Sequence, residues 1–182
     1  MSTLKTGALR GTSGTADSVQ LHASNQSVTF PGDVAVTGDV AVTGSTSTTA
    51  QPAFRAYGGP SSSTSVEILV FGSETFDIGG GYNTSDGKYT IPSGQGGIWV
   101  FCGSVMRNND EDDAIVALYK DSTGIAEGRC TTNVTNSSKG YASLDVISIA
   151  QASAGDTFYL KNESGNIHCN STLSQFWGYK LG

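Results

Sequence analysis

Residues 87–105 read Gly87-Lys-Tyr-Thr-Ile91, Pro92-Ser-Gly-Gln-Gly96, Gly97-Ile-Trp-Val-Phe-Cys-Gly-Ser-Val105. Two apolar runs of strand length flank a segment rich in proline and glycine. β-Branched and aromatic residues favour strands, whereas Pro-Ser-Gly favours a turn. This stretch therefore predicts two consecutive β-strands.

The same alternation of apolar run and turn continues on both sides. Gly is abundant (24 residues), charged residues make up 14% of the chain, and no helical periodicity extends beyond about two turns. We predict strands at 54–57, 66–71, 87–91, 97–105, 114–120, 124–130, 141–149, 157–162 and 174–181. This number and spacing predict an all-β domain, a two-sheet sandwich of jelly-roll type.

Large aromatic side chains in these runs are the candidate core. They can fill the space of about 10 Å between two packed sheets. The predicted head core is Phe54, Tyr89, Trp99, Phe101, Phe158, Phe176 and Tyr179.

The N-terminal part follows a different pattern. Residues 28–44 repeat a six-residue unit, Val-x-Φ-x-Gly-Asp, almost three times. In extended chain, the apolar members share one face that a single thin ribbon cannot bury, so partner chains are expected. These trimer-stalk residues are Val28, Phe30, Val34, Val36, Val40 and Val42. Asp33 and Asp39 recur one unit apart and are interpreted as polar turn residues.

Four segments follow from these patterns. Residues 1–27 are polar and form an N-terminal attachment segment, and residues 28–44 form a short β-structured stalk. Residues 45–52 are small and polar, as in a linker, and residues 53–182 form the head domain.

The charge, the hydropathy and the cysteines of the chain argue against a nucleic-acid partner and against membrane insertion. The net charge is −6 with no Lys/Arg cluster, so a nucleic-acid partner is not expected. No apolar signal core or membrane-length run is visible, which favours synthesis in a cytoplasm and no membrane insertion. Cys102 is predicted to be a buried small hydrophobe, whereas a Cys130–Cys169 disulfide and a metal site starting at His168-Cys169 stay open as alternatives.

One loop concentrates candidate ligands for a metal. Asp110, Glu111, Asp112 and Asp113 offer the hard oxygen atoms that Ca²⁺ prefers, and a solvated acidic loop is the alternative. We predict no catalytic site and no organic cofactor. Glu67 and Glu74 are better explained as surface charge than as a glycosidase pair. Tyr57, Tyr82 or Tyr141 could stack on sugars, but packing in the core or in a turn is the favoured interpretation for each.

The head segment resembles the globular head domain of complement component one, subcomponent q, which shares its jelly roll with the tumour necrosis factor family. The resemblance covers the C-terminal 130 residues in order. It is carried by Ala53-Phe-Arg-Ala56, by Tyr82 through Gly94 followed by Gly97-Ile-Trp-Val-Phe101, by Val116-Ala-Leu-Tyr-Lys120, by Gly155-Asp-Thr-Phe-Tyr-Leu160 and by Phe176-Trp-Gly-Tyr-Lys-Leu181. The resemblance implies a tight homotrimer.

A trimeric head behind a short glycine-hexad neck is similar to the fibre and virion structural proteins of tailed bacteriophages. This resemblance predicts a tail fibre or spike assembled in the host cytoplasm, attached to other virion proteins through residues 1–27. The head would bind a host-surface glycan or protein. A capsid-decorating or tail-assembly protein is the alternative hypothesis. A polysaccharide depolymerase is the third hypothesis.

Overall fold

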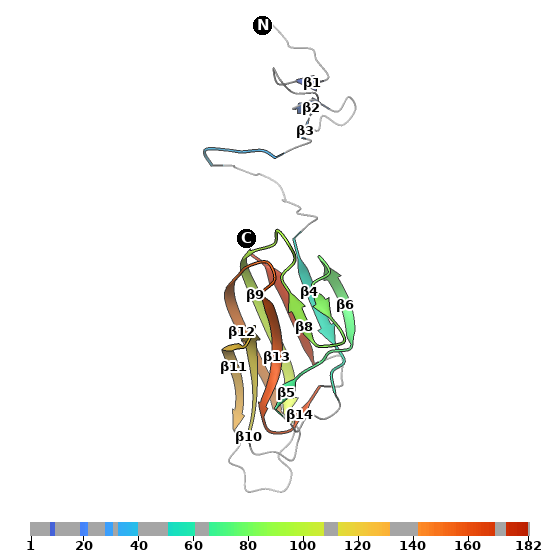
Figure 1. Ribbon diagram of the computed structural model, residues 1–182, viewed down its shortest axis with the longest axis vertical. Coiled ribbons are helices and arrows are strands. Elements are labelled where there is room, and N and C mark those ends of the chain that lie inside the picture. The colour runs from blue at the N-terminus through green and yellow to red at the C-terminus, as the bar shows by residue number, and fades with distance from the viewer. Residues whose placement is uncertain are drawn as a thin grey trace. The chain divides into compact units, whose positions relative to one another are not determined.

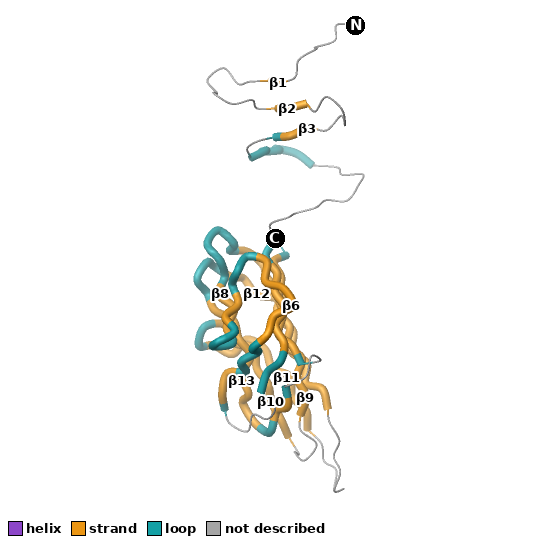
Figure 2. Tube along the Cα trace, turned by 90° about the vertical axis from the view of Figure 1, so that its right-hand side faces the viewer, coloured by secondary structure: helices purple, strands orange, loops and turns teal. Residues whose placement is uncertain are grey.

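The computed structural model describes residues 8–9, 19–21, 28–30, 33–39, 51–60, 66–107, 113–131, 142–169 and 174–181. Within these ranges the chain forms fifteen β-strands and no helix (Figures 1 and 2). The chain divides into two compact units, Met1–Ser47 and Thr48–Gly182. The division falls inside the predicted linker at 45–52.

Unit 1 contains a small antiparallel sheet of order β1-β2-β3. Its strands are β1 (Ala8–Leu9), β2 (Val19–Leu21) and β3 (Val28–Thr29). Within the described hexad residues, only Val28–Thr29 forms a strand, and residues 33–39 form none. A continuous β-ribbon along the hexads is therefore not found over 33–39, because a single chain offers these backbone groups no partner strand.

The apolar hexad residues that the structure describes are exposed. Val28, Phe30, Val34 and Val36 keep 48–56% of their surface accessible, and Asp33 and Asp39 are exposed as well. Val40 and Val42 lie outside the described residues. Burial of the hexads by partner chains stays a prediction.

Unit 2 is an antiparallel sandwich of two sheets, as the sequence predicted. Sheet 1 has the order β12-β9-β15-β4-β6, and β14 also pairs with β9. Its strands are β4 (Ala53–Tyr57), β6 (Ser73–Ile78), β9 (Gly97–Arg107), β12 (Ala142–Ala152), β14 (Ile167–His168) and β15 (Gln175–Lys180).

Sheet 2 has the order β11-β10-β13-β8-β7, and β5 also pairs with β13. Its strands are β5 (Glu67–Ile68), β7 (Tyr82–Asn83), β8 (Lys88–Thr90), β10 (Asp113–Lys120), β11 (Thr123–Thr131) and β13 (Thr157–Ser164). The sequence did not predict β6, β7 and β14. The sequence of β6, Ser-Glu-Thr-Phe-Asp-Ile, is largely exposed, so an apolar run could not mark it.

Aromatic rings from both sheets meet in the core. Phe101 of sheet 1 stacks on Phe158 of sheet 2 with ring centroids 4.0 Å apart, and Phe54 stacks on Tyr89 at 4.2 Å. Glycine makes room for this packing, because a Cβ added at Gly178 would lie 2.7 Å from the Phe101 ring. Six of the seven predicted core residues are buried here: Phe54, Tyr89, Trp99, Phe101, Phe158 and Phe176.

Tyr179 is the exception, and its assignment to the core was wrong. Its side chain is 38% exposed. Along β15, Phe176 and Gly178 are buried, so the strand alternation turns Trp177 and Tyr179 to the outer face of sheet 1.

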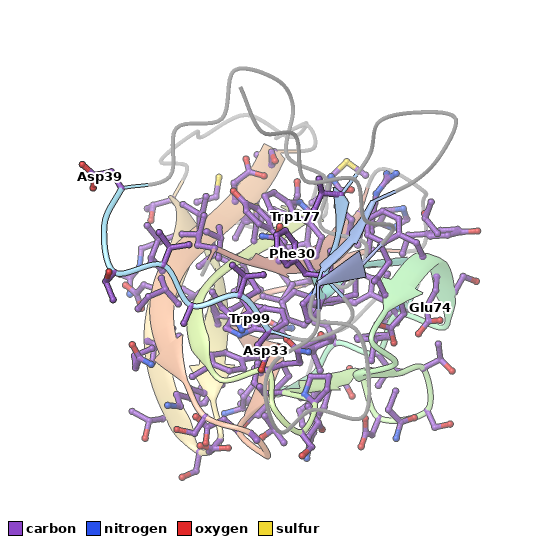
Figure 3. All side chains as sticks on the ribbon, turned by 90° about the horizontal axis from the view of Figure 1, so that it is seen from above. Phe30, Asp33, Asp39, Glu74, Trp99 and Trp177 are labelled. Carbon is purple, nitrogen blue, oxygen red and sulfur yellow. The ribbon has the colours of Figure 1, made fainter. Side chains whose placement is uncertain are left out.

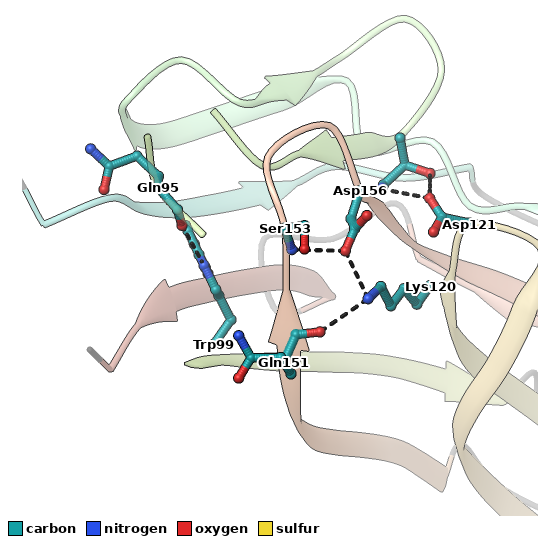
Figure 4. Close-up of polar contacts among 8 residues, drawn as sticks. Gln95, Trp99, Lys120, Asp121, Gln151, Ser153 and Asp156 are labelled. Atoms are coloured by element: carbon teal, nitrogen blue, oxygen red, sulfur yellow. Dashed lines mark hydrogen bonds and ion pairs between the residues drawn. The ribbon is translucent and has the colours of Figure 1, made fainter. Parts of the chain in front are cut away.

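A polar network joins the two sheets at one end of the sandwich (Figure 4). Lys120 of β10 donates to the Gln151 carbonyl of β12 at 3.0 Å and pairs with Asp156 at 2.7 Å. Asp156 also accepts from the backbone N–H of Ser153 at 2.8 Å. Nearby, Asp121 adopts a φ of 54° and accepts from the backbone N–H and the hydroxyl of Thr157. These contacts connect sheet 2 to the turn after β12.

Candidate functional site: the two outer faces of the sandwich

The outer face of sheet 1 carries two rows of apolar side chains that cross its five main strands. Directly paired residues on neighbouring strands place their side chains on the same face. The first row is Ile149, Val100, Tyr179, Ala53 and Ile78. The second row is Ile147, Cys102, Trp177, Arg55 and Phe76. We call these ten residues the apolar face.

Much of the apolar face is accessible in the single chain. Ile147 and Ile149 are 64% and 67% exposed, and Ile78 is 48% exposed. Trp177 and Tyr179 stack in parallel with centroids 6.2 Å apart. An exposed apolar patch of this extent is typical of an interaction surface.

Arg55 is the one charged residue of the apolar face. Its Nε donates to Gln175 Oε1 at 2.7 Å, on the neighbouring strand. This hydrogen bond to Gln175 holds the guanidinium of Arg55 along the surface of the sheet.

Cys102 belongs to the apolar face, so the prediction that it is buried was only partly right. It is half-buried on the outer side of β9, between Ile147 and Trp177. Partial burial raises the pKa of its thiol, and the Asp145 carboxylate adds to the rise. All three cysteines are free, so the alternative of a Cys130–Cys169 disulfide is not realised.

The outer face of sheet 2 has a different composition, built around two stacked tyrosines. Tyr119 of β10 and Tyr159 of β13 stack at 5.3 Å with an interplanar angle of 10°. Lys161 Nζ lies 5.0 Å from the Tyr119 ring centroid, and Lys88 Nζ lies 5.5 Å from that of Tyr159. Each ring thus has a lysine within the distance of a cation–π contact.

Glu163 completes this cluster. The Tyr119 hydroxyl donates to its Oε1 at 2.5 Å, and Lys161 Nζ lies 2.9 Å from the same oxygen. The hydrogen bond from Tyr119, together with Lys161, holds the pKa of Glu163 below its usual value. The same contact with Glu163 raises the pKa of Tyr119 and that of Lys161. The cluster therefore contains a stable carboxylate and a neutral phenol at neutral pH.

An open hollow of about 470 Å³ lies beside Tyr119. Its lining consists of Ile115, Ala117, Tyr119, Gly124, Ile125, Ala126, Glu127 and Glu163. Gly124 is the direct partner of Tyr119 on β11, on the side opposite Tyr159. A Cβ at Gly124 would lie 3.6 Å from Cζ of Tyr119, so the absence of a side chain there uncovers the ring.

The two residues considered for catalysis lie on strands of different sheets. Glu67 lies on β5 of sheet 2, whereas Glu74 lies on β6 of sheet 1, at the rim in Figure 3. Partial burial, with a contribution from Asp77, raises the pKa of Glu74. Both residues are exposed, and their interpretation as surface charge stays a prediction.

Most of the predicted metal site lies outside the described residues. This holds for Asp110, Glu111 and Asp112, and of the four only Asp113 is described. Its Oδ1 accepts from the Thr131 hydroxyl at 3.0 Å. Among the described residues, no three His, Cys, Asp or Glu side chains gather as metal ligands. Ca²⁺ binding by this loop stays a prediction.

The structure describes two of the three tyrosines that were considered for sugar stacking, and one of these two packs in the core. Tyr82 is buried and stacks on Phe54 at 5.4 Å, Tyr57 is half-buried on β4, and Tyr141 lies outside the described residues. Sequence reasoning did not single out the cluster of Tyr119 and Tyr159, although the pattern Tyr159-x-Lys161-x-Glu163 has the strand period of two and could have indicated it. The pairing of Tyr159 with Tyr119 depends on register between strands that are distant in sequence.

Comparison with known proteins supports the fold. No protein-family model and no curated protein matches the chain, but solved structures do. The globular domain of zebrafish complement 1qA is 13% identical, with a TM-score of 0.56, over 72% of this chain and 98% of that one. The Eiger tumour necrosis factor of S. frugiperda is 11% identical, with a TM-score of 0.61, over 72% and 93%. Murine APRIL is 10% identical, with a TM-score of 0.56, over 72% and 99%. The jelly-roll fold is thus shared with these proteins.

No helix long and apolar enough to cross a membrane occurs within the described ranges.

Proposed function

We propose that this chain forms a homotrimer through the apolar face of sheet 1. The observation that carries the proposal is the pair of apolar rows across the sheet, with Ile147 and Ile149 about two-thirds exposed. Burial of such a face is favourable by about 25 cal/mol per Å² of apolar surface removed from water. The resemblance to a family of trimeric heads supports three copies.

The exposed apolar hexads support the same assembly from the other unit. Val28, Phe30, Val34 and Val36 would gain partners if three N-terminal segments ran together. Two regions of one chain that both gain from partner copies favour a stable oligomer.

We further propose that the trimer is a virion structural protein of a tailed bacteriophage, a fibre or spike that acts without catalysis. The sequence pattern of a short neck behind a trimeric head supports this role. Residues 1–27 would attach to the particle, and the head would bind the host surface. Three weak head sites on one scaffold would add their affinities as avidity.

Light scattering on the purified full chain tests the assembly, and binding of the labelled protein to a panel of bacterial strains tests the role. We expect light scattering to give the mass of a trimer. We expect cells of some strains to retain the labelled protein. A monomer at micromolar concentration would contradict the assembly. A cryo-EM map of the particle that places the protein on capsid faces would favour capsid decoration instead.

A further inference from the structure

We propose that the hollow beside Tyr119 binds a neutral sugar ring, so that each head subunit carries one glycan subsite on the outer face of sheet 2. This inference deepens the proposed function and rests on it for its biological meaning. The evidence is the geometry around one tyrosine.

The first step is an aromatic face with one side left open. Tyr159 occupies the β13 side of Tyr119 at 5.3 Å, while Gly124 occupies the β11 side without a side chain. The C–H face of a pyranose needs a flat apolar surface of this kind. Ile125 and Ala126 continue the apolar lining next to the ring.

The second step is a set of acceptors at the edge of that surface. Glu127 and Glu163 line the hollow, and both can accept from sugar hydroxyls. The contacts of Glu163 with the Tyr119 hydroxyl and Lys161 fix its carboxylate in place. A fixed acceptor loses little conformational freedom when a ligand binds.

The third step is the charge of the hollow, which decides between a neutral and a cationic ligand. Each carboxylate already has a cation beside it: Lys161 lies 2.9 Å from Glu163, and Arg129 lies 3.8 Å from Glu127. The four charges sum to zero, so the site offers hydrogen bonds without a net attraction for cations. This balance favours a polyhydroxylated neutral ring over an ammonium group.

The size of the hollow agrees with this ligand. A volume of about 470 Å³ lies within the range of about 300–1,000 Å³ typical of small-molecule sites. The hollow is shallow and open, so we expect one exposed ring or two, bound with a dissociation constant of about 1 mM. The proposed trimer would carry three such subsites, which would act together through avidity.

Saturation-transfer NMR on the full-length protein tests the proposal. The probes are the methyl α-pyranosides of glucose, galactose and mannose, with choline as the cationic probe. We expect transfer to at least one pyranoside and none to choline. Transfer to choline alone, or to none of the probes, would overturn the proposal.

The decisive variant is Gly124→Val, which places a side chain against the open ring face. A Cβ at this position makes ordinary van der Waals contacts, and Gly124 does not need a positive φ, so the fold should persist. We expect transfer to fall by about tenfold, the loss of one aromatic contact. Unchanged transfer in this variant would overturn the site.

Thr90→Val is the matched control. It adds a valine to an exposed position of β8 in the same sheet, outside the lining of the hollow. We expect unchanged transfer to the pyranoside. Tyr119→Phe keeps the ring but releases Glu163, so an intermediate loss is expected.

The two proposals can fail separately. Light scattering and cell retention on the same samples report the proposed function. A trimer that still binds cells after Gly124→Val would contradict the glycan subsite alone. A wild-type protein that binds the pyranoside but is monomeric or does not bind cells would contradict the proposed function alone.

Discussion

The two outer faces of the sandwich carry aromatic side chains in very different settings. On sheet 1, Trp177 and Tyr179 stand among isoleucine and phenylalanine, with Arg55 as the one charged member of two rows. On sheet 2, Tyr119 and Tyr159 stand among Lys88, Lys161 and Glu163.

This difference separates a surface that needs burial from one that is stable in water. An aromatic ring with charged, hydrogen-bonded neighbours can remain exposed and still contact a ligand. A row of isoleucines has no such neighbours and gains only when water is removed. This contrast supports the proposal that sheet 1 packs against other copies of the chain while the outer face of sheet 2 stays in contact with solvent.

The largest expected effect is the loss of assembly when the apolar face is charged. Ile147→Asp combined with Ile149→Asp should leave a folded monomer, since each buried isoleucine contributes about 1.5–3 kcal/mol and a buried carboxylate costs more. Light scattering measures the mass. Thr90→Asp, on the outer face of sheet 2, should keep the trimer. A trimer in the double variant would contradict the assignment of the face.

The next effect tests the core that both faces share. Phe101 is fully buried and stacks on Phe158, so Phe101→Ala should lower the free energy of unfolding by about 3–5 kcal/mol. Urea denaturation followed by tryptophan fluorescence measures the change. We expect the same loss in the background of the charged apolar face, because the core does not depend on assembly. A much smaller loss there would show that core and face are coupled.

Cysteine reactivity compares the two sheets within one molecule. Cys102 lies on the apolar face, whereas Cys130, which is also partly buried, lies on β11 of sheet 2 and packs against the core. In the assembled protein, alkylation of Cys102 should be slower than that of Cys130 by roughly tenfold, since access and thiolate fraction set the rate. Peptide mass spectrometry after iodoacetamide treatment measures both rates. Cys169 is buried, and burial raises its pKa to about 12, so it serves as the unreactive reference. Equal rates at Cys102 and Cys130 would mean that the apolar face is open.

The smallest effect is a pH dependence confined to the tyrosine cluster. The pKa of Glu163 is lower in the folded state than its usual 4.5, so its contribution is complete above that value and is lost as the pH falls through the lowered pKa. The contribution should be only about 0.2–1 kcal/mol, because the pair is partly exposed. Thermal melts between pH 7 and pH 3 compare the wild type with Glu163→Gln.

The variant Glu163→Gln should reduce the loss of stability in acid but not abolish it. A second carboxylate also contributes, because the hydrogen bond from Lys120 lowers the pKa of Asp156 in the separate network that joins the two sheets. An identical acid profile in wild type and variant would contradict a role for Glu163 in stability.

Much of the sandwich could be predicted from the sequence because strand formation and core filling are local properties. The run at 97–105 has the composition of a strand wherever it lies, and the structure places it in β9. Phe101 and Phe158 are large enough that only a core can bury them. The exposed strand β6 carries no such signal and was missed.

The direction of a side chain within an apolar run could not be predicted. In 97–105 both alternating sets are apolar, so composition does not say which set faces the core. Cys102 and Tyr179 were assigned to the interior for this reason, and both lie on the outer side of sheet 1.

The sequence by itself determined that this chain is an all-β protein with a jelly-roll head and an apolar repeat that a single chain leaves exposed. Only the tertiary structure decided which side chains share an outer face. Ile149 and Ile78 come from opposite edges of sheet 1, and Tyr119 and Tyr159 meet across β10 and β13, through strand pairings that no local pattern records. The physical reason is that register depends on contacts between distant segments, whereas strand propensity depends on neighbours along the chain.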